Sequence, residues 1–234
     1  MSKLLRSLPV LAFCCLSACA SQQRPNLMRG GKIVTRGLAL DGQIMTGEAA
    51  QPRYGAYSYI LMKKAPRQDR RAWRLIREWH RLPYLTADVA SKKQNITLLP
   101  VQSVPPSTDP KVPWHLDNYD LDWSLGLLDR LKIKGHGPFI VTAIKPAQRL
   151  RLRDNIAIID FSDVHPDNVD AWFKHFKRCI EEPRSWRAND LTELLLQLHD
   201  RFTHIGTSVQ PVIIAAEYGR RIIRVVSPAT LLRK

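Results

Sequence analysis

Apolar residues follow two different patterns along the chain from residue 55 onward. Short runs rich in β-branched and aromatic residues indicate strands, whereas apolar residues that recur every three to four positions indicate helices with one buried face. The expected strands are 56–63, 95–102, 139–145, 156–161, 212–217 and 221–226, and the expected helices are 67–82, 118–132, 166–182 and 190–204.

The mixed order of these elements predicts an α/β or α+β fold, in which helices pack on a single mixed sheet. We expect about six strands and four helices in this sheet and its cover. Pro100 should place the end of strand 95–102 at an edge, since proline cannot donate to a strand ladder. Four prolines indicate a loop over 103–117, Asn118 is the expected cap of the next helix, and residues 218–219 should turn a hairpin.

The first 19 residues, MSKLLRSLPVLAFCCLSAC, have the layout of an export signal. Lys3 and Arg6 form a short positive segment, and the apolar run 8–16 that follows is much shorter than the roughly 20 residues of a spanning helix. The segment Leu16-Ser17-Ala18-Cys19 resembles the lipobox of bacterial prolipoproteins, and this resemblance covers residues 1–20.

The resemblance implies cleavage before Cys19, a diacylglycerol thioether on its sulfur and often an acyl chain such as palmitate on its new amino group. Ala20, which is not Asp, implies sorting to the outer membrane, with the protein on its periplasmic face. The chain then divides into a signal peptide (1–18), a lipidated cysteine with a flexible tether (19–54) and one α/β domain (55–234). Six of the eleven glycines fall between Gly30 and Gly55, which suits a tether, although a short strand within 32–40 also fits.

The chain is strongly basic, with a formal net charge of +15. Removal of Lys3 and Arg6 with the signal would leave +13. Such a charge favours anionic partners: phospholipid headgroups, lipopolysaccharide phosphates or acidic glycans of the envelope. An envelope protein partner is an alternative, and the compartment disfavours nucleic acid, although its electrostatic attraction would be the same.

One face of the expected helix 67–82 is apolar, and arginines gather on the opposite face. A guanidinium stripe suits phosphate or carboxylate groups, because each guanidinium forms bidentate hydrogen bonds. The alternative is an ordinary solvated face whose arginines pair with acids from elsewhere in the fold. The candidate anion-binding residues are Arg70, Arg71, Arg74, Arg77 and Arg81.

Further arginines occur at 149, 151 and 153 and at 220, 221 and 224. Their alternation predicts that the first three share one face of a strand. If these faces coincide in space with that of helix 67–82, they would form one extended basic surface.

Acidic residues and a histidine follow the apolar run 156–161, before the expected helix 166–182. Asp160, Asp163 and His165 could hold a metal or act as an acid–base pair, because active sites often occupy strand-to-helix loops. The other interpretation is that the acids of this loop cap the helix and interact with its dipole.

Two further segments combine groups that could carry chemistry. Trp114 to Trp123 interleaves aromatic rings with carboxylates, which suits sugar binding but equally suits helix capping and core packing. Cys179 follows His175 by one turn, as a nucleophile and base would, but Cys179 lies in an apolar stripe and is better explained as a core residue.

The sequence has no Walker loop, GxGxxG, HExxH or GxSxG, and no metal or cofactor is expected. The leading hypothesis is a lipid-anchored, non-enzymatic binding or envelope-assembly module with a basic surface. The alternative is a periplasmic hydrolase with its site near Asp160, Asp163 and His165.

Overall fold

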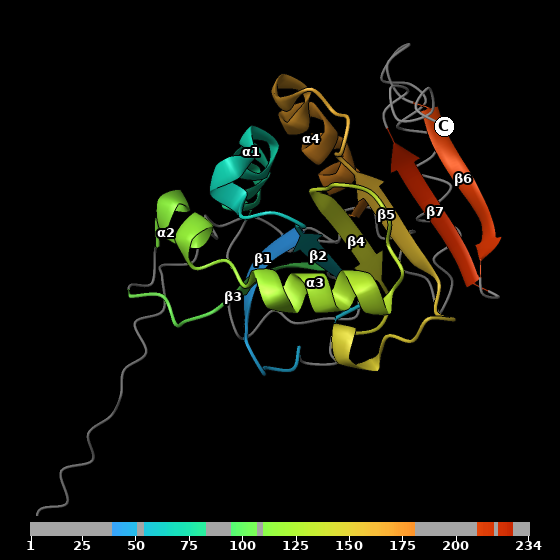
Figure 1. Ribbon diagram of the computed structural model, residues 1–234, viewed down its shortest axis with the longest axis horizontal. Coiled ribbons are helices and arrows are strands. Elements are labelled where there is room, and N and C mark those ends of the chain that lie inside the picture. The colour runs from blue at the N-terminus through green and yellow to red at the C-terminus, as the bar shows by residue number, and fades with distance from the viewer. Residues whose placement is uncertain are drawn as a thin grey trace, which may run out of the picture. The chain divides into compact units, whose positions relative to one another are not determined.

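The computed structural model describes residues 39–50, 54–82, 95–106, 110–180, 210–217 and 220–226. Seven strands form one sheet in the order β1-β3-β2-β4-β5-β7-β6 (Figure 1). Strands β1, β3, β2, β5 and β7 are parallel to one another, and β4 and β6 run against them. The strands are β1 (Ala39–Met45), β2 (Ala56–Leu61), β3 (Asn95–Val101), β4 (Phe139–Ala143), β5 (Ile156–Asp160), β6 (Gln210–Glu217) and β7 (Arg220–Val226).

Helices cover both faces of this sheet, so the prediction of a single mixed sheet with helices packed on it is confirmed. Helices α1, α2 and α4 pack on one face, and α3 packs on the other. The α-helices are α1 (Arg70–Trp79), α2 (Val112–Asp117), α3 (Leu121–Arg130) and α4 (Val169–Ile180), and the 3-10 turns are η1 (Pro66–Gln68), η3 (Ala147–Arg149) and η4 (Pro166–Asn168).

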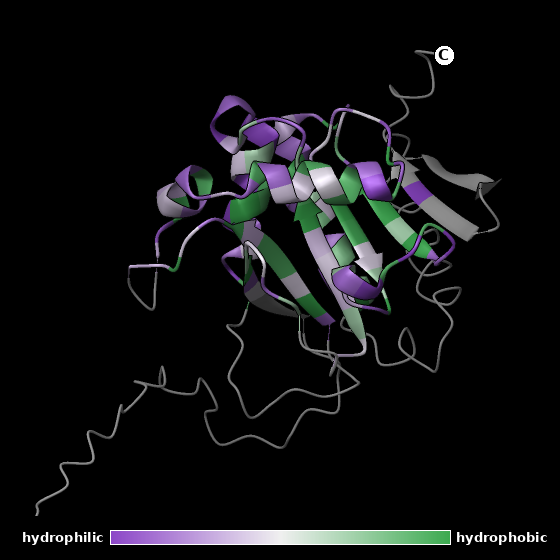
Figure 2. Ribbon diagram, turned by 60° about the horizontal axis from the view of Figure 1, so that its bottom comes forward, coloured by the Kyte–Doolittle hydropathy of each residue, from purple (hydrophilic) through white to green (hydrophobic). Residues whose placement is uncertain are grey.

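The alternation of side chains along each strand builds two separate cores. In β2, Tyr57, Tyr59 and Leu61 belong to the core under α3, whereas Ile60 belongs to the core under α1 and α4. Figure 2 shows the resulting pattern, with hydrophobic strands between amphipathic helices. Both faces of the central strands are thus buried, which explains why those strands appear as continuous apolar runs in the sequence.

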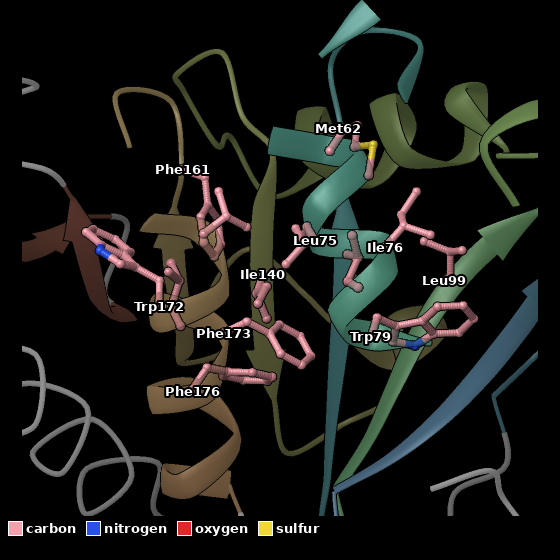
Figure 3. Close-up of a cluster of buried hydrophobic side chains, with 14 of the residues drawn as sticks. Met62, Leu75, Ile76, Trp79, Leu99, Ile140, Phe161, Trp172, Phe173 and Phe176 are labelled. Carbon is pink, nitrogen blue, oxygen red and sulfur yellow. The ribbon is translucent and has the colours of Figure 1, made fainter. Parts of the chain in front are cut away.

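The larger core lies between α1, α4 and the sheet. Leu75 of α1 and Phe173 and Phe176 of α4 lie together with Ile140 of β4 (Figure 3). Trp79 is also buried there, and its indole N–H donates to the carbonyl oxygen of Thr97 at 2.7 Å. Cys179 is fully buried in the same core, so its interpretation as a core residue is confirmed.

Two local expectations were wrong, and one was confirmed. Residues 39–45 form β1 and pair with β3, so the folded domain begins before the expected residue 55. Strand β3 lies inside the sheet, but its ladder with β2 stops at Leu98 and only the pairing with β1 continues to Val101, so the edge expected at Pro100 is confirmed for this end of the strand. Residues 112–117, expected to be a loop, form α2, because proline is compatible with the first turn of a helix.

The residue that caps α3 also differs from the expected Asn118. Asn118 ends α2, and Asp120 is the residue that caps α3, accepting a hydrogen bond from the backbone N–H of Trp123 at 2.9 Å. The expected hairpin is present as β6 and β7. The expected helix 190–204 and the signal and tether up to residue 38 lie outside the described residues.

Candidate functional site

Most arginines of helix α1 form ion pairs within the domain. Arg74 pairs with Asp167 and, at 3.6 Å, with Asp170. Arg77 lies 2.5 Å from Asp170, and Arg81 lies 2.5 Å from Glu78. The contacts of Arg74 and Arg77 join α1 to η4 and the beginning of α4, so these two arginines match the alternative in which acids from elsewhere in the fold neutralise the stripe.

Arg71 makes both an ion pair and hydrogen bonds to backbone carbonyl oxygens. Its guanidinium pairs with Asp69 at 2.8 Å and donates to the backbone carbonyl oxygens of Phe161 and Ser162. Arg70 is exposed and has no partner among the described residues. Arg71, Arg74 and Arg77 of the five-arginine face are therefore mainly structural links, and within the described residues Arg70 alone of the five has no partner.

The arginines at 149, 151 and 153 and Arg224 do not extend this face, whereas the side chains of Arg220 and Arg221 lie outside the described residues. Residues 147–149 form the turn η3, and no strand forms over 149–153. Ala147 and Leu150 belong to the core under α3, on the sheet face opposite α1. Arg224 points toward the end of β5, where it pairs with Asp160. The expected single surface is therefore divided among separate parts of the domain.

Asp160 is the centre of a buried polar network. It is only 1% exposed and pairs with Arg224, which also donates to the carbonyl oxygen of Lys134. The carboxylate of Asp160 accepts hydrogen bonds from the backbone N–H of Ser162 at 2.9 Å and from its hydroxyl at 2.5 Å. The hydroxyl oxygen of Ser162 in turn accepts from the backbone N–H groups of His136 (2.9 Å) and Gly137 (2.8 Å). This network fixes the segment before β4 to the end of β5.

His165 of the proposed acid–base site makes its contacts elsewhere, at the start of η4. The side chain of His165 is 69% exposed, and its Nδ1 accepts from the backbone N–H of Asp167 at the start of η4. No group of three potential metal ligands, such as one including Asp163, gathers within the described ranges. The arrangement of Asp160 and His165 is that of a fold-stabilising network and a capping residue.

The segment from Trp114 to Trp123 is divided between two helices. His115 is buried, and its ring centroid lies 5.0 Å from that of Trp79 and 5.2 Å from that of Trp114. Asp117 pairs with Arg67, and Asp120 caps α3. These roles match the capping and packing interpretation of the segment.

Two surface hollows of the described domain are lined by cations. The first, here called the lysine hollow, has a volume of about 760 Å³. The second, here called the arginine hollow, has a volume of about 520 Å³. The lysine hollow is lined by Lys63, Leu125, Leu128, Asp129, Lys132, Ile133 and Lys134, and the arginine hollow by Lys145, Gln148, Arg149 and Arg151.

The lysine hollow has more positive than negative charge. Lys132 lies 3.2 Å from Asp129, whereas neither Lys63 nor Lys134 has an acidic side chain within ion-pair distance in the described part of the chain. Burial lowers the pKa of Lys63, as does the charge of Arg224 nearby, against the opposing effect of Asp160. An anion in this hollow would therefore meet cations that the fold itself leaves uncompensated.

The arginine hollow has the same imbalance. Lys145 pairs with Asp154 at 2.5 Å. Burial raises the pKa of Asp154, but the hydrogen bonds from Lys145 and the backbone of Arg151 outweigh it and leave that pKa below its usual value. The guanidinium groups of Arg149 and Arg151 have no ion-pair partner among the described residues.

Sequence reasoning missed the lysine hollow. Lys63 follows β2, while Lys132 and Lys134 follow α3, and the chain brings them together because α3 packs over the face of the sheet that β2 shares. The available signal was weak: each lysine stands just after an expected apolar element, where the chain reaches a surface.

Gly135, which follows Lys134 of the lysine hollow, has a backbone conformation and surroundings that favour glycine. Its φ is +112°, and a Cβ at this position would lie 2.5 Å from the guanidinium of Arg224 and 3.1 Å from the carboxylate of Asp160. We expect Gly135→Ala to lower the free energy of unfolding by about 1–3 kcal/mol, measured by urea denaturation. Gly126→Ala is the matched control, because a Cβ in the helical Gly126 meets nothing within 4 Å and should be neutral or slightly stabilising. An equal effect of both substitutions would contradict the role given to Gly135.

No protein-family model matches the chain, and no match is found among curated proteins or solved structures. Within the described residues, no helix has the length and hydrophobicity needed to cross a membrane. The function must therefore be argued from the residues themselves.

Proposed function

We propose that the chain is a lipid-anchored bacterial envelope protein whose domain is a non-enzymatic binding module for anionic groups. In this proposal Cys19 carries the lipid and holds the protein on the periplasmic face of the outer membrane. The observation that carries the binding role is that both hollows are lined by cations, four of which lack an acidic partner in the described domain. These four are Lys63, Lys134, Arg149 and Arg151.

The charge balance supports this role. The net charge of +13 that remains after removal of Lys3 and Arg6 attracts anions over several ångströms, but a stripe neutralised by internal ion pairs adds little to local binding. Cations that have no internal partner can instead pair with a phosphate or a carboxylate without breaking a contact of the fold. The hollows are thus better candidates for anion binding than the stripe on α1.

The hydrolase alternative has less support. Asp160, which a catalytic site would need to have available, uses its carboxylate to bind Arg224 and Ser162. His165 is exposed and caps η4. These two of the three residues of the alternative, Asp160, Asp163 and His165, are thus explained as stabilising elements of the fold.

Capture of anionic vesicles would test the proposal. The full lipidated chain is held by its own anchor in immobilised phosphatidylcholine vesicles, and fluorescent vesicles with or without phosphatidylglycerol are added at low and high salt. We expect selective, salt-sensitive capture of the anionic vesicles. Loss of two surface cations near an anionic lipid should weaken capture about tenfold or more, since each contributes roughly 1 kcal/mol.

The variants separate the hollows from charge in general. Arg149→Gln with Arg151→Gln and Lys63→Gln with Lys134→Gln should each weaken capture. Lys174→Gln with Arg178→Gln removes the same charge from exposed positions of α4 and should have little effect. Equal capture of both vesicle types, or none, would exclude the binding role, and capture that all three variants weaken equally would assign it to net charge instead of the hollows.

A further inference from the structure

The two hollows differ in what lies beside their cations. The lysine hollow has an apolar lining of Leu125, Leu128 and Ile133, whereas the arginine hollow is lined by polar and charged residues. Of these three apolar side chains Leu125 is the most exposed, at 38%. A ligand that fills the lysine hollow would thus need an anionic part and an apolar part.

The apolar lining is built by the end of helix α3. The backbone N–H of Ile133 donates to the carbonyl oxygen of Leu128 at 2.9 Å, and the N–H of Lys132 donates to that of Asp129 at 2.9 Å. This pair of hydrogen bonds is the Schellman arrangement, which brings the residue after the turn against the last turn of the helix. It places Ile133 and Leu128 together as the apolar side of the hollow.

Lys132 occupies the position at which this arrangement favours glycine. Its φ is 53°, the left-handed conformation that costs energy for a residue with a Cβ. The chain therefore places a lysine beside the hollow where glycine would be the more stable choice. The φ of Lys132 is an observation independent of the charge count, and it supports a role for the Lys132 side chain in this hollow.

The charge of the hollow indicates the kind of anionic group. Three lysines and one aspartate line it, and the aspartate is already paired with Lys132. The excess of two positive charges matches a phosphomonoester, which carries about −1.5 to −2 at neutral pH. A fatty-acid carboxylate, with one charge, would leave a lysine uncompensated.

We propose that the lysine hollow binds one molecule of an amphiphile with a phosphomonoester headgroup, with the phosphate at Lys63, Lys132 and Lys134. The first part of its acyl chain lies against Leu125, Leu128 and Ile133. This assignment rests on the proposed function and specifies one ligand class for one of the two hollows.

Native mass spectrometry of the full lipidated chain in neutral detergent tests this directly, because it counts bound lipids per chain. The probes are dioleoyl phosphatidic acid, dioleoyl phosphatidylcholine and oleate at equal concentration. We expect one phosphatidic acid per chain, retained about tenfold more than either of the others. No such adduct, or an equal adduct with oleate or phosphatidylcholine, would overturn the proposal.

Variants assign the adduct to this hollow. Lys63→Gln with Lys134→Gln should lower its population about tenfold, and Leu125→Gln should lower it less. Lys132→Gly should weaken the adduct while raising the midpoint of thermal unfolding, which a merely structural lysine would not do. Lys174→Gln with Arg178→Gln, at exposed positions of α4 that line neither hollow, should leave it unchanged. An adduct that resists the changes at 63, 132 and 134 would overturn the assignment.

The two proposals can fail separately. If anionic vesicles are still captured but no phosphatidic acid adduct forms, the lysine hollow is not the lipid site and the general binding role stands. If anionic vesicles are not captured, the proposed function itself is excluded.

Discussion

Replacing Asp160 with alanine is expected to lower the free energy of unfolding by about 3–5 kcal/mol, because it leaves a partly buried guanidinium without its counter-charge. Asp160 is 1% exposed, and Arg224 opposite it is only 14% exposed. The substitution also removes the acceptor of two hydrogen bonds from Ser162. Urea denaturation followed by circular dichroism would measure the loss.

Three controls separate charge from shape at this position. Asp160→Asn keeps the size and an acceptor for Ser162, and should cost less than alanine. Arg224→Gln removes the other partner, and the double variant Asp160→Asn with Arg224→Gln should cost less than the sum of the two single changes, since both report on one pair. Additive effects would contradict the network described here.

The same substitutions bear on the hydrolase alternative. A structural Asp160 predicts loss of stability without loss of any specific chemistry. If Asp160→Asn were as stable as the parent chain but had lost a hydrolytic activity that the parent shows, the interpretation would reverse, and the strand-to-helix loop would be a catalytic site.

The fold was predictable where burial leaves a continuous apolar run. Residues 139–143 and 156–160 are buried on both faces, and such runs identify internal strands directly. Strand β1 was missed because its sequence, ALDGQIM, contains polar residues and a glycine. The structure gives the reason for that glycine: a Cβ at Gly42 would lie 2.8 Å from the side chain of Ile96 on β3. A Cβ there would also lie 2.9 Å from the side chain of Leu98, so side-chain packing on β3, which the sequence alone does not show, leaves little room at this position.

The candidate site was less predictable than the fold. Periodicity identified the arginine face of α1, but Asp167 and Asp170 lie 93 residues from the arginines with which they pair, and no local pattern connects them. For the same reason Lys63 could not be joined to Lys132 and Lys134. Local sequence shows which side chains share a face, whereas the pairing and the hollows depend on tertiary packing.

The anchor gives the second large expected effect. Cys19 lies outside the described residues, and its lipidation is expected from the lipobox resemblance. Each buried methylene contributes about 0.8 kcal/mol, so that one acyl chain anchors only marginally whereas two or three hold a protein essentially permanently. Cys19→Ala should therefore abolish incorporation of radiolabelled palmitate and release the protein from the membrane fraction.

Cys14→Ser and Cys15→Ser are the matched controls, because both cysteines lie in the segment that cleavage would remove, and both variants should still incorporate palmitate. Salt adds a second criterion. The lipidated parent chain should stay with the membrane in high salt, whereas any remaining attachment of Cys19→Ala should be electrostatic and disappear in a high-salt wash. Palmitate labelling that persists in Cys19→Ala, or a mature protein that retains Met1 with an unmodified sulfur at Cys19, would exclude the lipid anchor. The basic hollows would then have to be explained for a protein in another compartment, where nucleic acid would be the first anionic partner to test.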